Sequence, residues 1–154
     1  MMRLASKYVI WIVITTIFGL MSEAQFAYYS VKQQNDAKNI ALTFDDGPHQ
    51  ILSPRLLDSL KARNAKATFF VMGVKAIIHP NILARMQTEG HEVANHVWDH
   101  PVLSKLPFDQ VHEQISSTNE AIKKASGQVP KVMRPPYGNT NPKLNKQIAT
   151  KGIY

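Results

Sequence analysis

Apolar runs of strand length recur along the second part of the chain, separated by amphipathic segments. Ile40 to Phe44, Lys66 to Met72 and Glu92 to Asn95 each predict a buried strand. Lys131 to Met133 predicts a short fourth strand. Two consecutive prolines then stop any strand or helix, so we expect a fixed loop over Arg134 to Asn139.

The amphipathic segments between these strands have the spacing and end signals of helices. The first, Ser53 to Arg63, has leucines at helical spacing, a serine as its N-cap and Pro54 in its first turn. The second, Asn81 to Glu89, has its asparagine as N-cap and is closed by Gly90. A third and longer helix is predicted over Phe108 to Lys124, with an acidic first turn and a basic last turn.

The alternation of strands and helices places the chain in the α/β class. Such repeated units imply a parallel sheet with helices outside it and right-handed crossover connections. No internal repeat or low-complexity segment interrupts this pattern.

The composition of the 154-residue chain agrees with one folded domain, since 44% of the residues are hydrophobic and 19% are charged. The formal net charge is +7, but the lysines and arginines are scattered and form no dense block. We therefore expect no nucleic-acid partner. Attraction to an anionic wall polymer or membrane surface stays open on charge alone.

The first residues have the pattern of a secretory signal peptide. Arg3 and Lys7 precede an apolar run from Tyr8 to Leu20, and small residues at Ser22 and Ala24 suit signal peptidase. We expect a signal over residues 1–24, a polar linker over 25–38 and the folded domain over 39–154. The protein would then be secreted or wall-associated, without stable membrane insertion after cleavage. The alternative is an uncleaved membrane anchor, although the run falls short of the roughly 20 residues that span a bilayer.

Acidic and imidazole side chains follow two of the predicted strands. Asp45 and Asp46 come at the end of the first strand, and His96 and His100 follow the third. Because carboxyl ends of parallel strands share one edge of the sheet, we expect these side chains to converge there. One carboxylate and two imidazoles suit zinc or another borderline divalent ion and leave one position open, and the second carboxylate is then free for proton transfer. The chain has no cysteine, so thiolate ligands and disulfides are excluded.

Three segments, in this order, resemble the motifs of the polysaccharide deacetylase (NodB-homology) family of carbohydrate esterases: Thr43 to Pro48, His96 to Pro101 and Arg134 to Gly138. The resemblance covers about Asn39 to Tyr154. It implies a distorted, incomplete (β/α) barrel. It also implies removal of acetyl groups from N-acetylglucosamine polymers such as chitin or peptidoglycan, or from acetylated xylan.

The resemblance assigns a role to each candidate residue. It implies a divalent metal, Zn²⁺ first and Co²⁺ or Mn²⁺ as alternatives, held by Asp46, His96 and His100. It implies that Asp45 acts as general base and that Arg134 orients it. The backbone N–H of Tyr137 would help to bind the oxyanion, and Pro135 would shape the groove wall.

Three further histidines match no family position. His79, His91 and His112 are expected at the surface. Trp98 is expected to pack under the histidine loop rather than to stack on a sugar.

The chain departs from the family pattern at two places. Val97 stands where the family has Ser or Thr, which removes a hydroxyl that could tie the histidine loop together. The family domain also continues past the last residue of this chain, with a histidine that protonates the leaving amine. Asn141 to Lys151 predicts a helix, Gly152 its C-cap, and Ile153 and Tyr154 the start of another strand. We therefore expect a barrel truncated after about four to five β/α units, with impaired activity.

Three functions follow from these features. The first is metal-dependent hydrolysis of N-acetyl or O-acetyl groups on a polysaccharide, releasing acetate. The second is a non-catalytic glycan-binding or remnant protein that keeps the metal site. The third is a secreted metal-dependent hydrolase of a non-carbohydrate amide. Oligomeric state is left open by the sequence.

Overall fold

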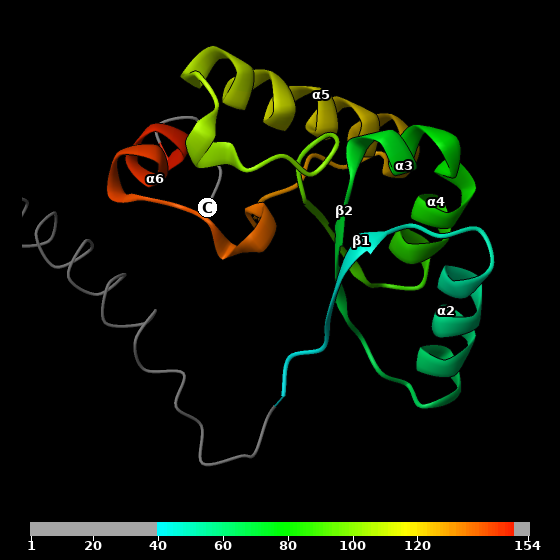
Figure 1. Ribbon diagram of the computed structural model, residues 1–154. Coiled ribbons are helices and arrows are strands. Elements are labelled where there is room, and N and C mark those ends of the chain that lie inside the picture. Colours follow the sequence, from blue (N-terminus) through cyan, green and yellow to red (C-terminus); the bar gives the residue numbers. More distant parts are fainter. Residues whose placement is uncertain (1–39, 150–154) are drawn as a thin grey trace, which may run out of the picture. The chain divides into compact units, whose positions relative to one another are not determined.

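The computed structural model describes residues 40–149. The predicted signal peptide, the linker and the last residues of the chain lie outside this range. The elements follow in the order β1 (Thr43–Gly47), α2 (Leu52–Ala62), β2 (Thr68–Val71), α3 (Gly73–Ile78), α4 (Pro80–Thr88), β3 (Glu92–Asn95), a 3₁₀ turn (Leu103–Lys105), α5 (Phe108–Ser126), a second 3₁₀ turn (Pro136–Gly138) and α6 (Pro142–Ala149) (Figure 1). Within residues 40–149, no helix is both long and apolar enough to cross a bilayer.

The three strands form a parallel sheet in the order β1-β2-β3, which confirms the predicted class. Thr43 pairs with Thr68, and Thr68 pairs with Glu92. The register between β1 and β2 shifts between Phe44 and Gly47, so the strand is irregular where the two aspartates lie. The predicted fourth strand is reduced to a single bridge between Asn95 and Met133, because prolines bound this segment on both sides and prevent a longer ladder.

The first strand begins later than the hydrophobic pattern predicts. Ile40 is 85% exposed, and pairing with β2 starts only at Thr43. The strand instead continues through the two aspartates to Gly47. Hydrophobicity was a poor guide here, because backbone pairing sets the limits of a strand whatever the polarity of its side chains.

Helix starts also differ by one or two residues from the predictions. In α2 the hydroxyl of Ser53 accepts the N–H of His49 at 2.8 Å and does not cap the helix. The imidazole Nδ1 of His49 does so instead, accepting the N–H groups of Ile51 and Leu52 at 3.1 and 3.2 Å. Helix α4 begins at Pro80, before Asn81, because proline suits the first helical position.

Helix α3 was not predicted at all. It has only six residues and lies directly between β2 and α4. A segment of that length is too short to establish a helical period in the sequence.

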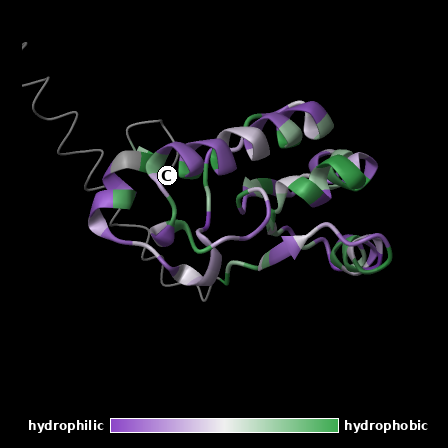
Figure 2. Cartoon of the chain, turned by 45° about the horizontal axis from the view of Figure 1, so that its top comes forward, coloured by the Kyte–Doolittle hydropathy of each residue, from purple (hydrophilic) through white to green (hydrophobic). Residues whose placement is uncertain are grey.

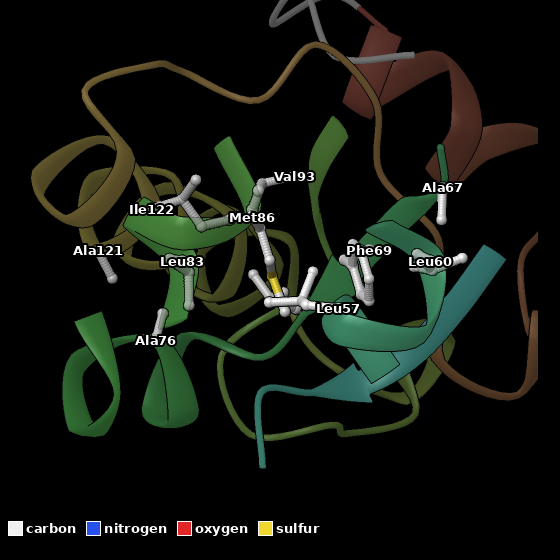
Figure 3. Packing of buried hydrophobic residues seen from close by; sticks show 11 residues of the cluster. Leu57, Leu60, Ala67, Phe69, Ala76, Leu83, Met86, Val93, Ala121 and Ile122 are labelled. Atoms are coloured by element: carbon white, nitrogen blue, oxygen red, sulfur yellow. The ribbon is translucent and has the colours of Figure 1, made fainter. Parts of the chain in front are cut away.

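Two hydrophobic clusters hold these elements together. The larger lies between the sheet and helices α2 to α5 (Figure 3) and contains Leu57, Leu60, Ala67, Phe69, Val71, Ala76, Leu83, Met86, Val93, Ala121 and Ile122. The smaller joins the histidine loop, α5 and α6 through Val97, Leu103, Val111, Ile115, Leu144 and Ile148. Hydrophobic and hydrophilic positions alternate around the helices, so each has an apolar side to bury (Figure 2). Burial of each large apolar side chain contributes about 1.5–3 kcal/mol to the stability of the fold. The packed core therefore holds in place the edge of the sheet that carries the polar residues.

Candidate metal centre

The carboxyl ends of the parallel strands bring the predicted site residues to one edge of the sheet. Asp45 and Asp46 lie at the end of β1. His96 follows β3 directly, and Arg134 follows the bridge that Met133 makes to Asn95. The common direction of the strands therefore explains why residues distant in sequence meet here.

Asp46, His96 and His100 form a compact group of three possible metal ligands. The carboxylate Oδ1 of Asp46 lies 3.4 Å from Nε2 of His96 and 3.2 Å from Nε2 of His100. One ligand atom from each residue can be chosen so that all three lie within 4.8 Å of one another. Neighbouring ligands of a tetrahedral zinc ion with bonds of about 2.0–2.1 Å are separated by roughly 3.3 Å, so the donor set fits such an ion.

His96 is oriented by the backbone that follows the Met133 bridge. Its Nδ1 lies 2.7 Å from the carbonyl oxygen of Arg134, and the residue is 2% exposed. A carbonyl only accepts hydrogen bonds, so Nδ1 carries a proton and, in the neutral ring, Nε2 presents its lone pair. That lone pair faces Oδ1 of Asp46, which is also an acceptor. A cation between two such acceptors relieves their repulsion, and this is the ligand arrangement of metal-bound histidine.

Asp46 occupies an unusual backbone conformation. Its φ angle is 65°, in the left-handed region, and its carbonyl oxygen accepts the Nζ of Lys75 at 2.7 Å. The register of β1 is irregular at this point, and the carboxylate lies beside both histidines. Lys75 comes from α3, so the helix missing from the sequence prediction helps to fix a ligand.

Asp45 faces a different partner. Its Oδ1 accepts Nη1 of Arg134 at 2.7 Å, and the same nitrogen lies 3.2 Å from the hydroxyl of Thr43. The guanidinium also stacks over the ring of Phe70, at 4.0 Å from its centroid. These contacts hold Asp45 beside the three-ligand group while leaving its second carboxylate oxygen without a protein partner among residues 40–149.

The loop after Arg134 borders the site. Tyr137 has a φ angle of 60° and is 71% exposed, and its ring meets the ring of His100 edge to face at 4.7 Å. Its backbone N–H makes no hydrogen bond to another described residue. Pro135 precedes the turn in an extended conformation and is partly exposed beside it. The structure thus brings all seven predicted site residues to one region.

His91 lies in a different environment from the one predicted. His91 was expected at the surface, but it is 4% exposed, because its Nδ1 accepts the N–H of Ala67 at 3.2 Å and its ring packs on Phe69. Burial lowers the pKa of His91.

Asn95 was missed as a functional residue. Its Oδ1 accepts the N–H of Val97 at 2.7 Å, and this hydrogen bond shapes the histidine loop. Its place directly before His96 was the only signal in the sequence.

Trp98 packs rather than faces the three ligands. A Cβ atom on Gly73 would lie 2.2 Å from its ring, and the ring borders the larger core cluster. The expected packing role agrees with this placement.

Comparison with known proteins identifies similar sequences. The sequence model of a family described as polysaccharide deacetylase matches residues 32–154. Peptidoglycan-N-acetylglucosamine deacetylase PgdA of Listeria monocytogenes is 47% identical over 111 residues, which cover 72% of this chain and 24% of that protein. Chitin deacetylase 1 of Cryptococcus neoformans is 34% identical over 117 residues, covering 75% of this chain and 25% of that protein.

Solved structures give the same fold. Peptidoglycan deacetylase PdaC of Bacillus subtilis matches with a TM-score of 0.69 and 46% identity, over 70% of this chain and 54% of that one. A family 4 carbohydrate esterase of Streptomyces lividans matches with a TM-score of 0.71 and 38% identity, over 74% and 59%. The described elements therefore have the NodB-type fold as an incomplete parallel α/β arrangement, and the chain spans only part of the length of these proteins.

Proposed function

Because the chain belongs to the polysaccharide deacetylase family, we propose that it is a metal-dependent deacetylase of a polysaccharide built from N-acetylglucosamine. The reaction is hydrolysis of an acetyl group, with release of acetate. Relatives named as peptidoglycan and chitin deacetylases support this substrate class. Hydrolysis of O-acetyl groups on a polysaccharide is the alternative form of this reaction.

The observation that carries the proposal is the pair of acceptors at the ligand group. Nε2 of His96 and Oδ1 of Asp46 face each other at 3.4 Å while the other ring nitrogen contacts a carbonyl. We propose Zn²⁺ as the ion, with Co²⁺ or Mn²⁺ as alternatives, because imidazole and carboxylate donors suit these metals. When bound, such an ion polarises an acetyl carbonyl and makes water a stronger nucleophile.

Asp45 is the proposed general base. Arg134 holds one of its oxygens at 2.7 Å and orients the carboxylate, so the other oxygen can accept a proton from water. The stacking of Arg134 on Phe70 limits the movement of the guanidinium and hence of the base.

The backbone N–H of Tyr137 is the proposed oxyanion donor. It makes no hydrogen bond to the other described residues, and the ring of the same residue is exposed and lies against His100. A donor of this kind contributes roughly 3 kcal/mol to the transition state. Pro135 is proposed to shape the wall of the groove there.

The location of the protein follows from its N-terminal sequence. We propose a signal peptide over residues 1–24, a linker over 25–38 and a polysaccharide deacetylase domain from residue 39. The signal peptide directs the protein to the extracellular space or the cell wall. An uncleaved N-terminal anchor is the alternative, and processing of the mature N-terminus distinguishes the two.

Acetate release tests the function. Chitin oligomers and peptidoglycan are incubated with the metal-loaded protein and with chelator-treated protein. We expect release only with metal, loss of release but not of metal in Asp45→Asn, and loss of both in Asp46→Asn. Asp109→Asn is the matched control, since Asp109 is exposed in the first turn of α5.

Two results would replace this proposal. Release that persists after the metal is removed would exclude a metal-dependent reaction. Metal-dependent binding of the sugar without acetate release would favour a glycan-binding protein that keeps the metal site.

A further inference from the structure

The histidine loop, Asn95 to His100, carries two of the three candidate ligands without an internal hydroxyl clamp. Val97 and His100 both have left-handed φ angles, of 59° and 68°. Valine is poorly suited to this conformation because its branched Cβ crowds the backbone. The shape of the loop must therefore be imposed by hydrogen bonds from its surroundings.

Three of these hydrogen bonds come from Asn95 and from the start of α3. The N–H of Val97 donates to the side chain of Asn95, and the carbonyls of Val97 and Trp98 accept N–H groups of Gly73 and Val74 at 3.0 and 3.1 Å. They fix the first half of the loop. The N–H groups of Trp98 and Asp99, nearest to His100, are left for another partner.

Gln114 of α5 is that partner. Its Oε1 accepts the N–H of Trp98 at 2.9 Å and the N–H of Asp99 at 3.3 Å. Its Nε2 donates to Oδ1 of Asp99 at 2.7 Å. The orientation of the amide is unambiguous, because two N–H groups need an acceptor and a carboxylate needs a donor. One side chain thus makes three hydrogen bonds to consecutive residues just before the second histidine.

We infer that Gln114 is a positioning residue for the metal site, acting through the loop on His100. The inference rests on the proposed metal centre. Among the described residues, the side chain of Gln114 makes no hydrogen bond to His96 or His100. It restrains the backbone from which His100 projects, while His96 is held independently by the carbonyl of Arg134. Outer residues that orient metal ligands typically change metal affinity by about 10–100-fold when they are replaced.

The test measures binding of Zn²⁺ and Co²⁺ to the metal-free full chain. Gln114→Met keeps the length and helix preference of the side chain but removes all three hydrogen bonds. We expect a dissociation constant about 10–100-fold higher and an altered Co²⁺ absorption spectrum at saturation, because the second imidazole is no longer held in place. Gln110→Met is the matched control, one turn earlier on α5 and exposed.

Rescue separates positioning from a general packing role. The double variant Gln114→Glu with Asp99→Asn exchanges donor and acceptor across the same contact and keeps an acceptor for both N–H groups. Its affinity and Co²⁺ spectrum are expected to return to within about threefold of the original protein. If Gln114→Met does not fold, Gln114→Asn takes its place, since it keeps an amide but withdraws it from the loop.

The outcomes separate a failure of this inference from a failure of the proposed metal centre. An original protein that binds no metal overturns both. Normal binding together with an unchanged affinity and spectrum in Gln114→Met overturns the role of Gln114 alone. A double variant that binds metal as weakly as Gln114→Met also overturns the role of Gln114, because the exchanged contact would then not matter.

Discussion

At the level of single residues, backbone strain marks the candidate site. Five non-glycine residues have positive φ angles within residues 40–149, and four of them, Asp46, Val97, His100 and Tyr137, lie in the loops of this site. The fifth, Asn64, lies in the turn after α2, where asparagine tolerates the conformation. Each strained residue costs about 1–3 kcal/mol and persists because neighbouring contacts fix it.

His91 predicts a pH dependence of stability. Burial lowers its pKa, so the unfolded chain takes up a proton at a higher pH than the folded chain does. Stability from this residue is complete above the unfolded pKa of about 6.5 and is lost as the pH falls below it. We expect the free energy of unfolding to fall between pH 7.5 and pH 5 in denaturant titrations.

Variants isolate this effect from the other histidines. His91→Gln should flatten the pH dependence, whereas His112→Gln, at an exposed position on α5, should leave it unchanged. Equal slopes for the original protein and His91→Gln would show that His91 does not contribute.

At the level of elements, α3 connects the core to the histidine loop. Gly73 begins this helix where Trp98 and Thr118 leave no space: a Cβ atom would lie 2.2 Å from the Trp98 ring and 2.7 Å from the Thr118 hydroxyl. Gly73→Ala should therefore displace Trp98 and the adjoining loop. We expect a loss of about 1–3 kcal/mol in unfolding free energy and weaker Zn²⁺ binding, measured by denaturation and metal titration.

Gly127 provides a contrast within the same fold. It ends α5 at a φ angle of 79° with no atom within 4 Å of an added Cβ. Gly127→Ala should cost about 1 kcal/mol through backbone conformation alone, with unchanged Zn²⁺ affinity. If both glycine variants weakened Zn²⁺ binding equally, the effect of the Gly73 variant would not come from its contact with Trp98.

Helix and strand patterns predicted most of this architecture, and the differences have specific causes. β3 matched its predicted limits, and α5 runs two residues beyond its predicted end. Helix α3 escaped detection because six residues do not establish a period. The fourth strand shrank to one bridge because prolines flank it. The convergence of the aspartates, histidines and Arg134 was predictable from parallel strand ends, whereas the contacts of Lys75, Asn95 and Gln114 depend on packing between elements distant in sequence.

At the level of the whole molecule, the candidate ligands link separate parts of the fold. Asp46 belongs to the edge strand β1, and His96 and His100 belong to the loop after β3. An ion bound to all three cross-links these parts in the folded state. The unfolded chain cannot hold the ligands in this geometry, so metal binding should raise the stability of the whole described unit.

Thermal unfolding measures this coupling. A metal at about 100 times its dissociation constant adds roughly 2.7 kcal/mol to the stability of the folded state. Since 1 kcal/mol moves Tm by roughly 4 °C in a domain of a little over 100 residues, we expect Zn²⁺ to raise Tm by on the order of 10 °C. A chelator should reverse the rise, and Asp109→Asn should show it in full. Asp46→Asn should show little of it, because two imidazoles alone leave the ion weakly held. An equal rise in Asp46→Asn would place the bound metal elsewhere on the protein and remove the basis for a reaction at this edge of the sheet.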